Sequence, residues 1–307
     1  MYKLIAVIGQ FLVLHAWPMF KWILHKVKGQ CELLRIQYEE QPGYSRTQRT
    51  ERSLKNSKFT ECHEVIAKVS EHSLSDRVSD VSLIKGVVYD KHPVFRRRFT
   101  ECVERILGYT RLLDELERLR TEKYEEGKHQ QQLLNLWKTL KPDEPLSERY
   151  TRQWGDIGFQ GTDPASDFRG MGLLGLLNLI YFSEEHCDVA RQTVMHSNHP
   201  KYGYSFAIVG INLTEMCIRY MRSGLFKRHF YNLESANPTV QDFNELYCYV
   251  FVEFDKLWMK EKPNIMQFNA MRDKYEGQLD KLLTGNNRPL PLLSKTAAEF
   301  NLVAQEC

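Results

Sequence analysis

The sequence predicts an all-α fold. Apolar residues recur every three or four positions over two long stretches, with charged residues between them, which is the pattern of amphipathic helices. The first stretch runs from Phe99 to Leu119 and the second from Val240 to Trp258. A third observation is negative: no stretch alternates apolar and polar residues between hairpin turns, so we expect no β-sheet.

The N-terminal residues form an apolar segment. Residues 4–24 would be about 31 Å long as a helix, nominally enough to cross a hydrocarbon core, but Gln10, His15 and Pro18 interrupt them. Cationic residues follow and favour the cytosolic side of a membrane. We expect residues 1–27 to be a helix that contacts a membrane as an anchor or interfacial helix. A core helix of a soluble protein and a cleaved signal peptide are the alternatives.

The rest of the chain divides into three expected parts. Residues 28–126 form an N-terminal helical region, in which the polar residues 40–60, with the breaker Pro42-Gly43, read as a loop running into a basic helix start. The polar stretch 121–132 is the expected boundary. Residues 133–284 form the main domain, with helices over 133–140, 206–221, 240–258 and 268–282. Residues 285–307 have little periodicity and are expected to be a loosely ordered tail.

Composition excludes several classes of function. Lys+Arg 42 against Asp+Glu 39 gives a net charge of +3, which is too small for a general nucleic-acid binder. The seven cysteines form no CxxC pair and no cluster with zinc spacing, so we expect reduced thiols and no metal site. A GxxxxGK[ST] loop is absent, so the chain is not expected to be a P-loop nucleotidase itself.

The stretch WGDIGFQGTDPASDFRGMGLLGLLNLIYF, residues 154–182, places an arginine between a turn and a long apolar run. Asp163-Pro164 and Ser166-Asp167 are typical of a turn and a helix start, so we expect a helix from near Phe168. The residues after it are apolar nearly all round, which indicates a central buried helix. Glycines 170, 172 and 175 each weaken a helix by about 1 kcal/mol, so another backbone is expected to approach closely.

Arg169 is thus expected on the first turn of that helix, where the macrodipole disfavours a cation by about 0.3 to 1 kcal/mol. Two explanations stay open. An ion pair with Asp167 or Asp163 could neutralise it, or its guanidinium could be free to reach a partner's phosphates, with a neighbouring carboxylate aiming it. Gln160 leaves a similar choice, because its amide could satisfy turn amides or could orient a water or a partner's loop.

These residues resemble the ELMO domain. The pattern W-x-x-I-G-F-Q-G-x-D-P-x-[ST]-D-F-R-G-M-G-L-L-G-L is matched throughout residues 154–176. His199–Met216 and Glu253–Trp258 are similar to later parts of the same domain. Lys28–Ile36, after an apolar leader, is similar to the small ELMO-domain-containing proteins, the ELMOD family. The resemblance covers about residues 20–284 and is firm from about residue 133 onward.

The resemblance implies a multi-helix ELMO-type domain with an N-terminal helical extension, acting as a GTPase-activating protein for Arf and Arf-like small GTPases. Arg169 would be its catalytic residue, and we assign Gln160, Asp163, Asp167 and Gly170 to positioning or docking. The chain would be a regulator of a partner enzyme, at the cytosolic face of an intracellular membrane. No cofactor is expected, because the GTPase would carry GTP and Mg²⁺. The alternative is a membrane-associated adaptor that binds a small GTPase or an exchange-factor complex without catalysis.

Overall fold

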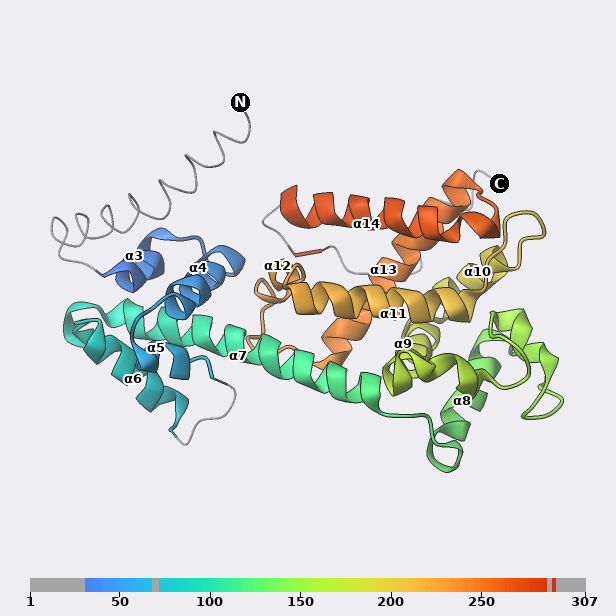
Figure 1. Cartoon of the computed structure of the whole chain (residues 1–307), viewed down its shortest axis with the longest axis horizontal. Coiled ribbons are helices and arrows are strands. Elements are labelled where there is room, and N and C mark those ends of the chain that lie inside the picture. The colour runs from blue at the N-terminus through green and yellow to red at the C-terminus, as the bar shows by residue number, and fades with distance from the viewer. Residues whose placement is uncertain (1–30, 68–71, 286–288, 291–307) are drawn as a thin grey trace. The chain divides into compact units, whose positions relative to one another are not determined.

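A computed structural model describes residues 31–67, 72–285 and 289–290, and every regular element in these ranges is helical (Figure 1). The all-α prediction is confirmed. The α-helices are α3 (Glu32–Glu39), α4 (Tyr44–Lys55), α5 (Thr60–Glu64), α6 (Leu74–Ile84), α7 (Pro93–Thr121), α8 (Glu126–Leu140), α9 (Gly172–Glu185), α10 (Cys187–Ser197), α11 (Phe206–Ser223), α12 (Lys227–Phe230), α13 (Val240–Glu261) and α14 (Phe268–Gly285). Short 3-10 turns are η2 (Tyr89–Lys91), η3 (Arg152–Ile157), η4 (Pro164–Arg169) and η5 (Ile265–Gln267).

The chain packs as two compact units, and the boundary between them lies inside helix α7. Of the described residues, the first unit comprises those up to Thr110 together with Phe230–Asn237, and the second comprises Arg111–His229 and those from Pro238 onward. Phe230–Asn237 joins the first unit because the rings of Phe230 and Tyr231 both pack on Tyr109, with centroids 5.8 Å away. The expected domain ranges 28–126 and 133–284 stay predictions, since this division follows packing alone.

Helix α4 contributes a polar buried face to the first unit. Gln37 Nε2 donates to Thr50 Oγ1 at 2.9 Å, and Tyr231 OH donates to the Glu51 carboxylate at 2.8 Å. The basic helix expected to start within the stretch 40–60 is present, but it begins already at Tyr44, directly after Gly43, so the preceding loop is shorter than expected. Its buried positions are mostly polar, and satisfied hydrogen bonds make their burial tolerable.

Helix α9 is the centre of the second unit, as expected. It packs against α8, α10, α11 and α13 (Figure 1). Ten of its residues are buried, among them Leu174, Leu176 and Phe182, which have no exposed surface. Phe182 stacks on Phe206 of α11 and packs at a tilt against Phe251 of α13, with ring centroids 6.2 and 5.2 Å away. Burial of this all-round apolar helix gives the unit a rigid core.

Two hydrogen bonds from histidines join α13 to α10 and to the residue directly before α10. His186 Nε2 lies 3.0 Å from Glu245 Oε2, and His196 Nδ1 lies 2.7 Å from Asp255 Oδ2. A tyrosine hydroxyl also donates to each carboxylate, from Tyr181 to Glu245 and from Tyr204 to Asp255. His186, directly before α10, and His196, within it, therefore fix one register of α10 against Glu245 and Asp255 of α13.

His229 should make the second unit sensitive to acid. Its ring is 1% exposed, its Nδ1 accepts the Leu290 N–H at 3.2 Å, and burial lowers its pKa to about 4. Between pH ~6.5 and ~4 the unfolded chain binds this proton more readily than the folded protein, so the free energy of unfolding should fall across that window by up to about 3 kcal/mol.

Urea unfolding at pH 7, 5.5 and 4, on the wild type and on His229→Gln, measures this effect. Glutamine does not titrate, so the stability of the variant should depend less on pH across the window. Equal pH dependence in the two proteins would contradict the assignment to His229.

Two expectations concern residues at the chain ends. Residues 4–24 lie outside the described residues, so the expected membrane helix is not observed, and no helix in the described ranges is long and apolar enough to span a bilayer. Most of the expected tail also lies outside them, although Leu290 is described and is buried.

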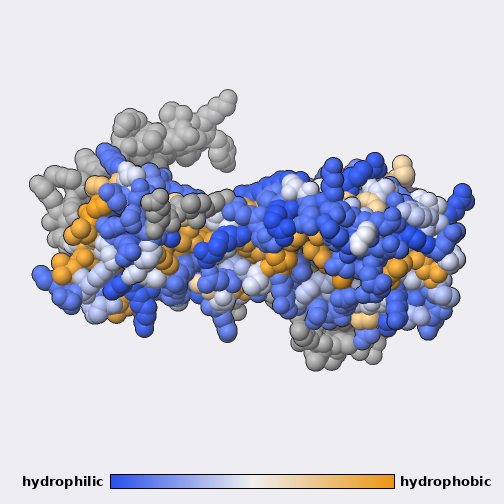
Figure 2. Space-filling model, turned by 90° about the horizontal axis from the view of Figure 1, so that it is seen from below, coloured by the Kyte–Doolittle hydropathy of each residue, from blue (hydrophilic) through white to orange (hydrophobic). Residues whose placement is uncertain are grey.

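The face in Figure 2 is largely hydrophilic, with apolar residues in smaller patches between the hydrophilic ones.

Candidate functional site

The segment that carries the motif lies on an aromatic platform in the second unit. Trp154 is fully buried, and its ring meets Trp137 of α8 edge to face at 5.5 Å and Phe159 at 5.9 Å. Phe159 in turn meets Phe168 of η4 at 5.6 Å. The turn that bears Arg169 therefore rests on packed rings and not on a free loop.

Gly158 brings this segment against the start of α11. Its φ is +82°, and a Cβ on it would lie 2.6 Å from the Ser205 carbonyl carbon and 2.8 Å from the Ala207 nitrogen. Only glycine combines this left-handed conformation with so close a backbone approach. The turn before Gln160 is thus fixed by contact with helix α11.

Arg169 is exposed and is the last residue of η4. Its Nε donates to the Ser166 carbonyl oxygen at 2.7 Å, which fixes the plane of the guanidinium. In the ranges that the structure describes, neither terminal nitrogen has a hydrogen-bond partner and no carboxylate forms an ion pair with the group. Its position just before α9 corrects the expectation of a first helical turn, because the helix begins at Gly172 and not near Phe168.

The two nearby carboxylates are occupied by other donors. Asp163 Oδ1 forms an ion pair with Arg149 Nη2 at 2.9 Å and accepts the Ala165 N–H at 3.1 Å. Asp167 Oδ2 accepts the Gln160 N–H at 2.7 Å. Burial raises the pKa of the Asp167 carboxyl, although the Gln160 N–H and the charge of Arg169 oppose this. The ion pair with Asp167 or Asp163, one of the two explanations left open for Arg169, is therefore absent from the described residues.

Gln160 and Gly170 lie on the surface of the same segment. The Gln160 side chain is exposed, and the backbone N–H of this residue makes the contact with Asp167. Gly170 is exposed too, and a Cβ on it would meet no atom within 4 Å. The structure thus brings together all five candidates, Gln160, Asp163, Asp167, Arg169 and Gly170, on one turn and the loop before it.

The start of helix α9 is set by the end of helix α7. Gly172 has a φ of +51°, and a Cβ on it would lie 2.5 Å from the Glu122 carbonyl oxygen and would also clash with the Arg120 carbonyl oxygen. Leu173 N–H donates to the Glu122 carbonyl oxygen at 2.8 Å. The close backbone approach expected from the glycines occurs at Gly172, and it ends the 3-10 turn after Arg169.

Sequence reasoning missed two residues of this site, Arg149 and Tyr124. The Arg149 guanidinium lies 4.9 Å from the Tyr150 ring centroid and 5.9 Å from that of Tyr124. The available signal was weak, since a single arginine before a tyrosine in a polar stretch has the composition of an exposed loop. The Arg149 side chain is in fact only 11% exposed, unlike that of a loop arginine.

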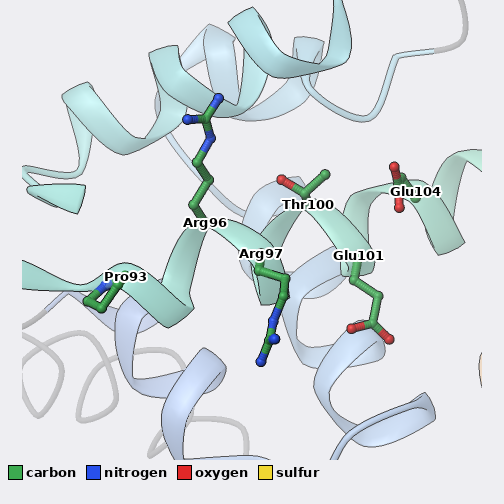
Figure 3. Close-up of a pocket in the computed structure, with 6 residues that line it drawn as sticks. All are labelled: Pro93, Arg96, Arg97, Thr100, Glu101 and Glu104. Carbon is green, nitrogen blue, oxygen red and sulfur yellow. The ribbon is translucent and has the colours of Figure 1, made fainter. Parts of the chain in front are cut away.

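A hollow in the first unit offers no competing site. It has a volume of about 490 Å³ and is lined by Pro93, Arg96, Arg97, Thr100, Glu101 and Glu104 of helix α7. Figure 3 shows that Arg96 points to the opposite side from Arg97 and Glu101, so the charged groups do not converge. Arg96 donates to Ser75 Oγ at 2.9 Å. Among the described residues no cluster of side chains could hold a metal ion.

The model of the ELMO/CED-12 family matches residues 114–272, a range that contains this whole segment. ELMO domain-containing protein 2 of Mus musculus is 42% identical over 275 residues, which cover 89% of this chain and 93% of that protein. For ELMO domain-containing protein 1 of Homo sapiens the identity is 38% over 328 residues, covering 98% and 97%. ELMO domain-containing protein B of Dictyostelium discoideum is 35% identical, covering 86% and 94%. The chain belongs to this family, among its ELMO domain-containing proteins.

Proposed function

We propose that this protein is a GTPase-activating protein for Arf or Arf-like small GTPases and that it supplies Arg169 in trans to the partner's nucleotide. The observation that carries the proposal is the state of Arg169: exposed, held at Nε by the Ser166 carbonyl, and without an ion pair among the described residues. Membership of the ELMO domain-containing proteins agrees with the resemblance of the motif.

The chemistry favours an arginine held in this way. GTP hydrolysis is limited by charge that builds on the phosphoryl oxygens and the leaving group, and an arginine supplied by a second protein accelerates it by roughly 10³ to 10⁵. That acceleration corresponds to about 4 to 7 kcal/mol of barrier. A guanidinium already neutralised within its own protein would contribute less. Asp163 pairs with Arg149 and Asp167 accepts the Gln160 N–H, so neither neutralises Arg169, which supports the proposed role of Arg169.

The other site residues have supporting roles in the proposal. Asp163 and Asp167 hold the turn, and the exposed Gln160 and Gly170 would face the GTPase. Gly170 leaves room for close approach of the partner's backbone, because no atom of this chain needs a glycine there. GTP and Mg²⁺ would be bound by the GTPase. Membrane contact through residues 4–24, at the cytosolic face of an intracellular membrane, also stays a proposal.

The direct test is single-turnover GTP hydrolysis by a panel of Arf and Arf-like GTPases, loaded with GTP and Mg²⁺, with and without the full chain. At least one GTPase should respond with an acceleration of ~10³ or more, while a Ras-type GTPase outside the Arf group serves as the matched control. Binding of a GTP-loaded Arf-like GTPase without any acceleration across the panel would contradict the proposal and favour the adaptor.

A further inference from the structure

Arg149 is a partly buried cation beside the Arg169 turn, and the proposed chemistry does not use it. Its side chain is only 11% exposed, and its guanidinium faces the rings of Tyr150 and Tyr124. Nη2 donates to Asp163 Oδ1 at 2.9 Å, and Nε lies 3.8 Å from Glu126 Oε1. A buried guanidinium in contact with rings and carboxylates has little freedom to change its geometry.

Asp163 connects Arg149 to the turn that carries Arg169. It is the N-cap of η4, accepting the Ala165 N–H at 3.1 Å, while Arg169 ends the same six-residue turn. The charges of Asp163 and Arg169 both act on the carboxyl of Asp167, which lies between them in the sequence. A displacement of Asp163 would therefore be transmitted through η4 to Arg169.

Both ends of the segment from Arg149 to Leu173 bond to residues 122–126, at and after the end of α7. Tyr124, in the connection between α7 and α8, accepts from Arg149 Nη2 at 3.5 Å, and Tyr150 OH donates to Glu126 at 2.8 Å. At the other end Leu173 N–H donates to the Glu122 carbonyl at 2.8 Å. The segment from Arg149 to Leu173 is thus fastened at both ends to residues 122–126.

We infer that Arg149 is a positioning residue for Arg169: by holding Asp163 against the α7–α8 connection, it fixes the turn that presents the exposed guanidinium. Its effect on GTP hydrolysis rests on the proposed function. The anchoring itself is a property of this chain and can be measured without a GTPase.

Three variants separate the parts of this anchor. Arg149→Met keeps the length of the side chain against the two rings and removes its charge. Asp163→Asn keeps a good N-cap oxygen and removes the opposite charge. Arg219→Met is the matched control, since it removes an arginine paired with Glu276 and Glu215, in the same unit, that makes no contact with Asp163.

Amide hydrogen exchange followed by mass spectrometry tests the anchoring alone. In Arg149→Met and in Asp163→Asn, peptides from residues 158–173 should exchange about tenfold faster, because local opening becomes easier. The control variant should match the wild type there. Unchanged exchange in both test variants would overturn the inference, and so would faster exchange throughout the second unit, which indicates a general loss of stability. If Arg149→Met does not fold, the exchange of Asp163→Asn tests the inference by itself, because the Asp163 side chain is partly exposed and its replacement should be tolerated.

Kinetics on a responsive GTPase test the positioning role. The maximal single-turnover rate should fall about tenfold in Arg149→Met, while the half-saturating concentration stays within about twofold. The double variant with Asp163→Asn should lose no more than Arg149→Met alone, because both changes break one contact. A raised half-saturating concentration at full rate would overturn the inference in favour of docking. If Arg169→Ala has no effect, the proposed function fails, and exchange alone decides on the anchor.

Discussion

Replacing Arg169 with alanine is expected to lower the maximal rate of GTP hydrolysis on a responsive GTPase by about 10³-fold or more. The loss is large because the guanidinium would act only in the transition state, where it neutralises charge on the phosphoryl oxygens. The half-saturating concentration should change little. Single-turnover assays over a range of protein concentrations measure both quantities.

Two further variants make this test specific. Arg169→Lys keeps the charge but loses the planar fork, so the rate should again fall steeply. Arg152→Ala removes another exposed arginine, on the preceding turn η3, and should keep most of the activity. Because Arg169 is exposed and forms no ion pair in the described part of the chain, the thermal midpoint of Arg169→Ala should match the wild type within about 1 °C. Full activity of Arg169→Lys would remove the catalytic role.

Gly172→Ala is expected to destabilise the protein by about 2 to 5 kcal/mol. An alanine there must adopt a φ of +51°, and its Cβ would lie 2.5 Å from the Glu122 carbonyl oxygen. The left-handed conformation and the steric conflict each cost about 1 to 3 kcal/mol. Thermal unfolding followed by circular dichroism should show the midpoint falling by about 10 °C.

Gly170→Ala provides the control within the same motif. Gly170 has ordinary right-handed backbone angles and open space around it, so its free energy of unfolding should change by no more than about 0.5 kcal/mol. Equal stability of the two alanine variants would mean that the contact between Gly172 and the end of α7 does not exist in solution.

A repeat of apolar residues every three or four positions predicts those helices that pack through apolar contacts. Helix α13 ends only three residues beyond the predicted Trp258, and buries Phe243, Phe251 and Trp258 fully. Helix α4 could not be found in this way, because most of its buried residues are polar and Glu51 bonds to Tyr231, 180 residues later. A helix that is stabilised by hydrogen bonds to distant residues shows no apolar repeat in its own sequence.

In the candidate site too, local sequence predicted some features, whereas contacts with distant residues determine others. The aromatic and glycine residues of the motif indicated a turn at Arg169, and that turn exists. The start of α9 was predicted too early, since it depends on the carbonyl oxygens of Arg120 and Glu122, about fifty residues earlier. The polar stretch 121–132 also contains contacts that its composition did not indicate, because Glu122 and Tyr124 contact Leu173 and Arg149.

The histidine–carboxylate contacts of α13 with α10 and with His186, the residue before α10, restrict how this domain can change during evolution. His186 and His196 are ten residues apart, as are their partners Glu245 and Asp255. Inserting or deleting one residue between either pair would rotate one member by about 100° and break its tie. Length variation among orthologues should therefore collect in the loops, and these two helices should keep a constant residue count.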